Sequence, residues 1–310
     1  MKNYLFHILF LILIFTGCSN NSSHIDSVIA NEDNSESSAD LPKLNTDDAG
    51  YHYDLKNPKR TWELPASLVE VSGNTWVDKT HLLLIDDRHP NLYLINIHDK
   101  SVVLEKTIPF HDDEKDKFDI EDVAIANDVV YALWSHGVLF KISNWNSTPE
   151  TKEIPTFLSK ENNTEGLCYD PVTKNLLIAC KDDSGIEGED KSTKAVYQFD
   201  MATEKLEKKP FLIIHKKDFE KIAGQKLIFN PSAIAVHPVT HNIYLLSTRD
   251  NKCMAVFNRA GDLISFQFID ENLMAQPEGI CFSPEGVLYI STEGKSGLGK
   301  LLEFENNKKR

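Results

Sequence analysis

The sequence TEGLCYDPVTKNLLIACKD (residues 164–182) occurs twice more in closely similar form, as PSAIAVHPVTHNIYLLSTRD (231–250) and PEGICFSPEGVLYISTEG (277–294). Each copy joins a short extended segment, a turn and a strongly apolar strand. Two looser copies precede them, at residues 69–87 and 120–135. A further alternating apolar segment follows every copy, so each copy is expected to begin a multi-stranded antiparallel sheet.

Antiparallel sheets that recur every 40 to 50 residues or so are typical of β-propeller blades. The five copies therefore predict an all-β, five-bladed β-propeller over residues 51–305, and a six-bladed ring is the less favoured alternative. The longest interval holds two insertions, an acidic loop at 182–191 and the stretch 215–230, in which Lys216–Ile222 is expected to form a helix. The last copy lacks an obvious outer strand, so the strand-like segment 59–64 is expected to close the ring.

The N-terminus resembles an export signal. Lys2 precedes an apolar run, Leu5–Phe15, that ends in Thr16-Gly17-Cys18. The run is too short to span a membrane, and a cysteine after a small residue resembles a lipoprotein cleavage site. We therefore expect residues 1–17 to be a signal peptide and Cys18 to be lipidated. An ordinary signal peptide with an incidental cysteine is the alternative.

Residues 18–50 are expected to form a disordered acidic tether. Residues 19–50 contain seven Ser, five Asn and seven acidic residues against the single base Lys43, with no periodic apolar pattern. Ser19 follows Cys18, and lipoproteins without Asp at that position resemble those of the Gram-negative outer membrane. The expected location is therefore the cell envelope, with the protein held at the membrane by its lipid. Residues 306–310 form a polar tail.

The charge excludes one class of partner. The chain has 33 Lys and Arg against 47 Asp and Glu, a net charge of −14, which repels phosphate backbones. No nucleic-acid partner is expected. The five cysteines include no C-x-x-C pair, which disfavours a zinc site.

Four copies place a glutamate near the start of the first strand, which lines the central tunnel of a propeller blade. These residues are Glu70, Glu121, Glu165 and Glu278, with the tunnel-lining Ser232 in the remaining copy. Carboxylates that converge in one tunnel repel each other, and a calcium ion bound by their oxygens would remove the repulsion. The alternative is that each carboxylate accepts hydrogen bonds from nearby backbone N–H groups.

These segments resemble the SdiA-regulated family. The resemblance covers roughly residues 60 to 305 and rests on the following motifs: Val69-Glu70-Val71-Ser72-Gly73, Asp119-Ile120-Glu121-Asp122, Thr164-Glu165-Gly166-Leu167, Pro231-Ser232-Ala233-Ile234-Ala235 with His237-Pro238, and Gln276-Pro277-Glu278-Gly279-Ile280. It implies a five-bladed, exported or lipid-anchored propeller with a calcium site in the tunnel and no established enzymatic activity. Ala233 and Asp122 stand where the family commonly has Gly.

Charged residues near the ends of the second strands are expected to gather on one rim and to bind a polar ligand: Asp86, Arg88, Asp182, Arg249, Asp250 and Glu293. His237 and His241 are spaced like helical metal ligands. However, they lie in a turn where the preceding copy has Asp170 and Lys174, which disfavours a histidine metal site.

The sequence leaves two functional classes open. The favoured one is a monomeric, non-catalytic envelope lipoprotein that holds calcium and presents a face to an unknown protein, glycan or small polar ligand. The alternative is a metal-dependent hydrolase of the lactonase or esterase type, in which the tunnel ion polarises a carbonyl. The chain has no G-x-S-x-G motif and no clear general base apart from the expected ligands, which favours the first class.

Overall fold

The computed structural model describes residues 51–109, 119–223 and 227–307. The predicted signal peptide, Cys18, the tether up to residue 50 and the last three residues of the tail lie outside the described residues. Within the described part of the chain, no helix is long and apolar enough to cross a membrane.

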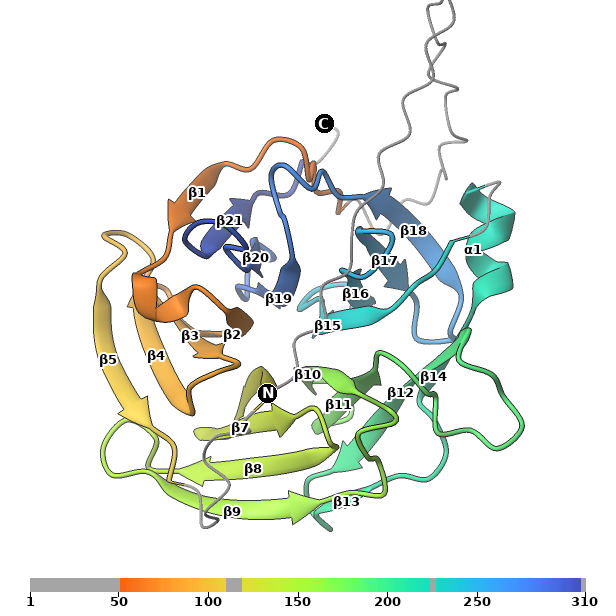
Figure 1. Ribbon diagram of the computed structural model, residues 1–310, viewed down its shortest axis with the longest axis horizontal. Helices are drawn as coiled ribbons and strands as arrows, with labels where there is room; N and C mark the ends of the chain where they lie inside the picture. Colours follow the sequence, from red (N-terminus) through yellow and green to blue (C-terminus); the bar gives the residue numbers. More distant parts are fainter. Residues whose placement is uncertain (1–50, 110–118, 224–226, 308–310) are drawn as a thin grey trace, which may run out of the picture. The chain divides into compact units, whose positions relative to one another are not determined.

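Five antiparallel sheets surround a central axis, which confirms the predicted all-β, five-bladed propeller (Figure 1). Blade 1 contains β2 Val71–Asp78, β3 His81–Asp86, β4 Asn91–Asn96 and β5 Val102–Thr107. Blade 2 contains β6 Ile120–Ala126, β7 Val129–Trp134, β8 Val138–Ser143 and β9 Glu150–Pro155. Blade 4 contains β15 Pro231–Val236, β16 Ile243–Ser247, β17 Cys253–Phe257 and β18 Leu263–Phe268.

Blade 3 is enlarged by the two predicted insertions. It contains β10 Thr164–Asp170, β11 Asn175–Cys180, β12 Thr193–Asp200, β13 Lys205–Leu206 and β14 Leu212–His215. Both β13 and β14 pair with β12, and helix α1 (Lys216–Ala223) follows β14 directly, where a helix was expected. Phe219 of α1 stacks on Phe229, with ring centroids 4.7 Å apart, so the helix is fixed to the segment that leads into blade 4.

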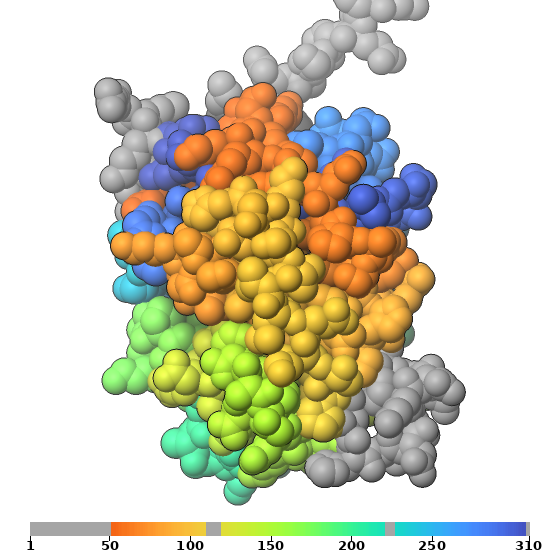
Figure 2. Space-filling model, turned by 90° about the vertical axis from the view of Figure 1, so that its left-hand side faces the viewer, coloured from red at the N-terminus to blue at the C-terminus, as the bar shows by residue number. Residues whose placement is uncertain are grey.

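Blade 5 is built from both ends of the folded chain, as predicted. Its strands β19 Pro277–Phe282, β20 Leu288–Thr292 and β21 Lys300–Phe304 are completed by β1 Arg60–Glu63. Trp62 pairs with Leu301 across β1 and β21, and its side chain is buried. Figure 2 shows orange residues from the start of the propeller beside blue residues from its end. The short 3-10 helix η1 (Ala66–Leu68) then leads into blade 1.

Every inner strand carries a β-bulge at the same position of the repeat. In each blade, one residue of the inner strand is skipped in the pairing with the second strand. The bulged residues are Ser72, Glu121, Glu165, Ser232 and Glu278. Since a bulge redirects a side chain and ends regular pairing, the five equivalent side chains come to lie at one end of the ring. We call this end, where the inner strands begin, the mouth.

Glycines follow three of the bulges, Gly73, Gly166 and Gly279, and each faces a neighbouring inner strand at close range. A Cβ atom on Gly73 would lie 2.3 Å from Asp122 Oδ1, so only glycine fits there. Asp122 accepts hydrogen bonds from the N–H groups of Val123 and Leu167, at 2.8 Å each. Asp122 thus links the inner strands of blades 2 and 3 and occupies space left by Gly73 of blade 1.

The first described residues are fixed to the opposite end of the ring through His237. Its Nδ1 accepts hydrogen bonds from the backbone of Val239 and Thr240. Its Nε2 then carries the proton and donates to the hydroxyl of Tyr53, which donates to the carbonyl of Gly286. Burial lowers the pKa of His237 to about 4, so the imidazole is neutral at pH 7. The histidine organises a turn, as the repeat comparison indicated.

Candidate functional site

The mouth gathers carboxylates from several blades. Glu121, Glu165 and Glu278 occupy the bulges of blades 2, 3 and 5, and each of them interacts electrostatically with Lys181, which follows β11. Glu165 and Glu278 are almost fully buried. These three glutamates lie within electrostatic reach of one another, and their binding of a metal stays a prediction.

Glu70 does not share the register of the other three glutamates. The residue equivalent to them in blade 1 is Ser72, because Val71 pairs with Asp86 and Gly73 pairs with Ile85. Ser72 donates a hydrogen bond to the carbonyl of Ile120 in the next inner strand at 2.7 Å. The expected common register was therefore wrong for Glu70, which comes just before β2.

Ser232 lines the mouth in the same way as Ser72. Its side chain is buried and donates a hydrogen bond to the carbonyl of Pro277 in the adjacent inner strand, at 2.9 Å. In blades 1 and 4, the bulged residue thus satisfies the backbone of the next blade. The two serines add no charge to the mouth.

Lys181 is the central cation of the mouth. Its Nζ lies 2.5 Å from Glu165 Oε2, and Asn163 donates a hydrogen bond to the other carboxylate oxygen at 2.8 Å. Burial opposes the charge on Lys181, but the carboxylates of Glu165 and Glu278 outweigh burial and raise the pKa of the ammonium group. Lys181 therefore stays charged at neutral pH.

One ammonium group does not neutralise these three carboxyl groups. Burial and the nearby Glu165 raise the pKa of Glu121 well above its ordinary value. Burial also raises the pKa of Glu278 well above its ordinary value, although Lys181 opposes the shift. The mouth therefore has more carboxyl groups than cationic groups, which favours the binding of either a proton or a cation.

A second acidic cluster lies beside the first, between blades 1 and 5. One carboxylate oxygen each of Glu70, Asp87 and Glu293 lie within 4.8 Å of one another. Asp87 follows β3 and Glu293 follows β20, so both come from the ends of second strands. The Oδ1 atom of Asp87 is buried and has no hydrogen-bond partner among the described residues.

The carboxyl groups of this cluster are strongly perturbed. Burial, with Asp86 and Glu70 nearby, raises the pKa of Asp87 to about 7. Burial, with Glu70 and Asp87 nearby, raises the pKa of Glu293 to about 7. A buried oxygen without a partner and two carboxyl groups poised near neutrality are features of a site that accepts a cation.

The two arginines of the predicted rim form ion pairs with nearby carboxylates. Arg88 lies 2.5 Å from Glu70, and Arg249 lies 2.5 Å from Asp182. Asp250 is exposed and accepts a hydrogen bond of 3.4 Å from Asn230.

One expected rim residue has a different role, and one residue of the mouth was missed from the sequence. Asp86 is buried and accepts hydrogen bonds from the backbone of Arg88 and His89, so its carboxylate organises a turn. Lys181 was not singled out from the sequence. The signal was its place directly after a second strand, which is also the place of Asp87 and Glu293 in their own copies.

Comparison with known proteins identifies the sequence group and the fold. The sequence model of the family described as SdiA-regulated matches residues 48–295. No curated protein matches the chain. The glutaminyl cyclase of Myxococcus xanthus is similar in structure, with a TM-score of 0.56 and 14% identity over 80% of this chain and 95% of that protein. The virginiamycin B lyase of Staphylococcus aureus is 14% identical, with a TM-score of 0.44 over 79% and 73%. At these identities, the structural likeness shows the fold alone.

Proposed function

The chain belongs to the SdiA-regulated family, and from that premise we propose that it is a non-catalytic β-propeller lipoprotein of the cell envelope that holds calcium at its mouth. The bound ion fixes the loops of blades 1 and 5, and the ion-paired rim presents a surface to a protein, a glycan or a small polar ligand.

The acidic cluster of Glu70, Asp87 and Glu293 carries the proposal. Calcium takes six to eight oxygen ligands at about 2.3–2.6 Å, so ligands on opposite sides of the ion are roughly 5 Å apart. The three carboxylate oxygens, all within 4.8 Å of one another, fit this spacing. The unpartnered Oδ1 atom of Asp87 supplies a buried oxygen that needs a cation or a proton.

Among the four glutamates expected as ligands, we propose a direct role for Glu70 alone. Glu165 already pairs with Lys181, and Glu278 interacts electrostatically with the same ammonium group. When ionised, Glu121 and Glu278 add negative potential that draws a cation into the mouth. We therefore propose that Glu121, Glu165 and Glu278 act on the ion through their charge and are not direct ligands.

Calcium titration tests this site. Each of Glu70→Gln, Asp87→Asn and Glu293→Gln is expected to weaken calcium binding at least about tenfold, because each removes a charged oxygen ligand. Calcium should raise the melting temperature of the wild type by mass action, and a chelator should reverse the rise. The affinity should fall as the pH drops below about 7, because protons then compete for Asp87 and Glu293.

The control is Asp250→Asn, which removes an equal charge from the exposed rim. It should leave calcium affinity almost unchanged, since Asp250 lies outside the cluster. A wild type that binds no calcium in calorimetry, or an Asp250→Asn variant that loses as much affinity as Asp87→Asn, would contradict the proposed site.

The lipid anchor is a separate part of the proposal and rests on the Thr16-Gly17-Cys18 sequence after the apolar run. Labelled palmitate supplied to cells is expected to enter the wild type and to be absent from a Cys18→Ala variant. Fractionation should then show the wild type, and not the variant, in outer-membrane vesicles. Equal labelling of the two proteins would refute lipidation at Cys18.

One observation favours the second functional class, a metal-dependent lactonase or esterase. In the protein without a bound ion, Asp87 and Glu293 have pKa values of about 7, so a carboxyl group of this cluster that does not coordinate the ion would be suited to proton transfer at neutral pH. Hydrolysis of simple lactones and aryl esters by the calcium-loaded wild type, lost in Asp87→Asn, would support this class. No hydrolysis by protein that binds calcium would favour the non-catalytic function.

A further inference from the structure

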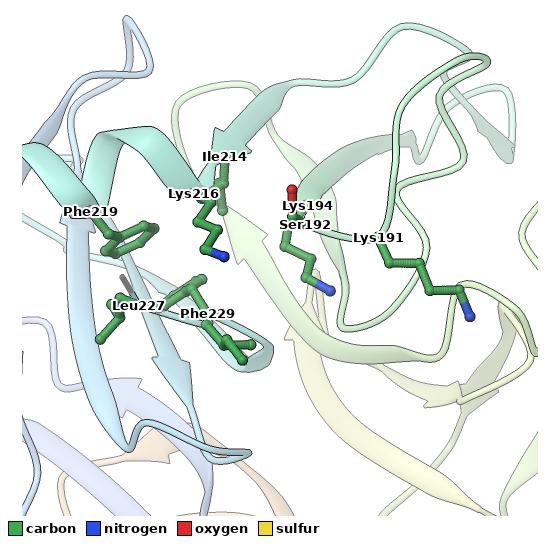
Figure 3. Close-up of a pocket in the computed structure, with 9 residues that line it drawn as sticks. Lys191, Ser192, Lys194, Ile214, Lys216, Phe219, Leu227 and Phe229 are labelled. Atoms are coloured by element: carbon green, nitrogen blue, oxygen red, sulfur yellow. The ribbon is translucent and has the colours of Figure 1, made fainter. Parts of the chain in front are cut away.

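A pocket of about 200 Å³ lies apart from the mouth, at the junction of blades 3 and 4. It is formed by the loop before β12, by β14 and α1, and by the segment that leads into β15 (Figure 3). Among the described residues that line it, three are lysines and none is acidic, although the whole chain carries a net charge of −14. The pocket is thus a local cationic site on an acidic protein.

Lys194 supplies a buried positive charge to this pocket. Lys194 is only 4% exposed. Its Nζ donates one hydrogen bond, to the carbonyl of Asp182 at 2.9 Å. An ammonium group has three N–H donors, so two donors of Lys194 lack a hydrogen-bond partner among the described residues. Unpaired donors on a buried cation are costly, and an anion in the pocket would satisfy them.

The carboxylates near Lys194 do not fill this role. Asp182 directs its carboxylate to Arg249, and Asp183 accepts a hydrogen bond from the backbone of Gly185. Asp190 is exposed and accepts a hydrogen bond from the backbone of Ser192. Lys216, at the start of α1, adds a second ammonium group (Figure 3). In Figure 3, the ammonium group of Lys194 lies between those of Lys216 and Lys191, and that of Lys216 is nearest to Phe229.

The other side of the pocket is apolar. Phe219, Leu227 and Phe229 are all buried, and in Figure 3 they lie together on one side of the lysines. Their stacked and packed side chains offer a hydrophobic surface next to the two ammonium groups. A ligand that fits both halves must combine an anionic group with an apolar body.

We propose that this pocket binds a small organic carboxylate with an apolar or aromatic body, its carboxylate between Lys194 and Lys216 and its body against Phe219 and Phe229. The volume of about 200 Å³ is below the range of roughly 300–1,000 Å³ typical for drug-sized ligands, so the occupant is small. The site is independent of the proposed calcium cluster, with which it shares no residue.

Three small ligands test separately whether binding needs the negative charge and whether it needs the apolar body. They are phenylacetate, phenylacetamide and acetate. Calorimetry on the chelator-treated protein is expected to show phenylacetate binding at least about tenfold more tightly than either of the others. Phenylacetamide lacks the charge, and acetate lacks the apolar body. Binding that persists without calcium keeps the outcome separate from that of the calcium proposal.

Variants of the lysines locate the site. Lys194→Met and Lys216→Met should each weaken phenylacetate binding at least about tenfold, because each removes one ammonium group and keeps an apolar stem. Lys217→Met is the matched control, since Lys217 is exposed and does not line the pocket. If Lys194→Met does not fold, the partly exposed Lys216 decides the test. No phenylacetate binding to the wild type, equal binding of phenylacetamide, or equal loss in Lys217→Met would overturn the proposal.

Discussion

Deletion of residues 51–65 is expected to leave the protein unable to form a stable propeller. The deletion removes β1, which is the fourth strand of blade 5, and opens the ring at β21. It also removes four large buried side chains: Tyr53, Leu55, Trp62 and Leu64. Loss of a buried side chain of this size costs about 2–5 kcal/mol, so the combined loss matches or exceeds a typical folding free energy of about 5–15 kcal/mol.

A point substitution measures the same closure without removing the chain. Trp62→Ala should lower the free energy of unfolding by about 3–5 kcal/mol in urea denaturation. Thr61→Ala is the control, because Thr61 is exposed on the same strand, and its effect should stay within about 0.5 kcal/mol. An unchanged urea midpoint for the deletion variant would show that the ring is held closed without β1.

The architecture was predictable because the same order of apolar and polar residues recurs in every blade. Alternation in the inner strands and continuous apolar second strands follow from burial in a blade, and the orphan strand near Trp62 matched the missing strand after β21. The helix that begins at Lys216 was predictable for the same reason, because its apolar positions follow a helical period. These features depend on residues close in the sequence.

The mouth was less predictable because it depends on register and on contacts between blades. The segment Val69-Glu70-Val71-Ser72 alternates with a period of two, so Glu70 and Ser72 were equally plausible at the shared position. The structure selects Ser72, whose hydroxyl group reaches Ile120 of the next blade. Likewise, the proximity of Asp87 to Glu293 depends on closure between blades 1 and 5, which no local pattern encodes.

The role of Lys181 also depends on contacts between blades, so it was not predictable from the sequence. From the sequence, the mouth glutamates were expected to be an unbalanced set that needs an external ion. The structure places an internal cation 2.5 Å from Glu165 and within electrostatic reach of Glu121 and Glu278. An external ion is then needed chiefly at the neighbouring cluster, where the exposed Arg88 is the one ion-pair partner of Glu70 among the described residues.

Lys181→Met is expected to destabilise the propeller by about 3–5 kcal/mol at neutral pH, because it leaves the buried carboxylate of Glu165 without its cation. Burial already raises the pKa values of Glu121, Glu165 and Glu278, and removal of Lys181 should raise them further. At pH values above the ordinary pKa of glutamate, the folded variant then binds more protons than the unfolded chain. Its deficit relative to the wild type should therefore grow as the pH rises and shrink as the pH falls.

A second substitution and a surface pair separate this effect from a general loss of packing. Adding Glu165→Gln to Lys181→Met removes the uncompensated charge, so the double variant should regain part of the lost stability in chemical denaturation at neutral pH. Lys252→Met breaks the pair with the exposed Glu271 and should cost less than about 1 kcal/mol. If Lys181→Met were as stable as the wild type, or if Glu165→Gln deepened its loss, Lys181 could not be the cation that the mouth carboxylates require. In that case, a bound ion would have to stabilise both acidic clusters.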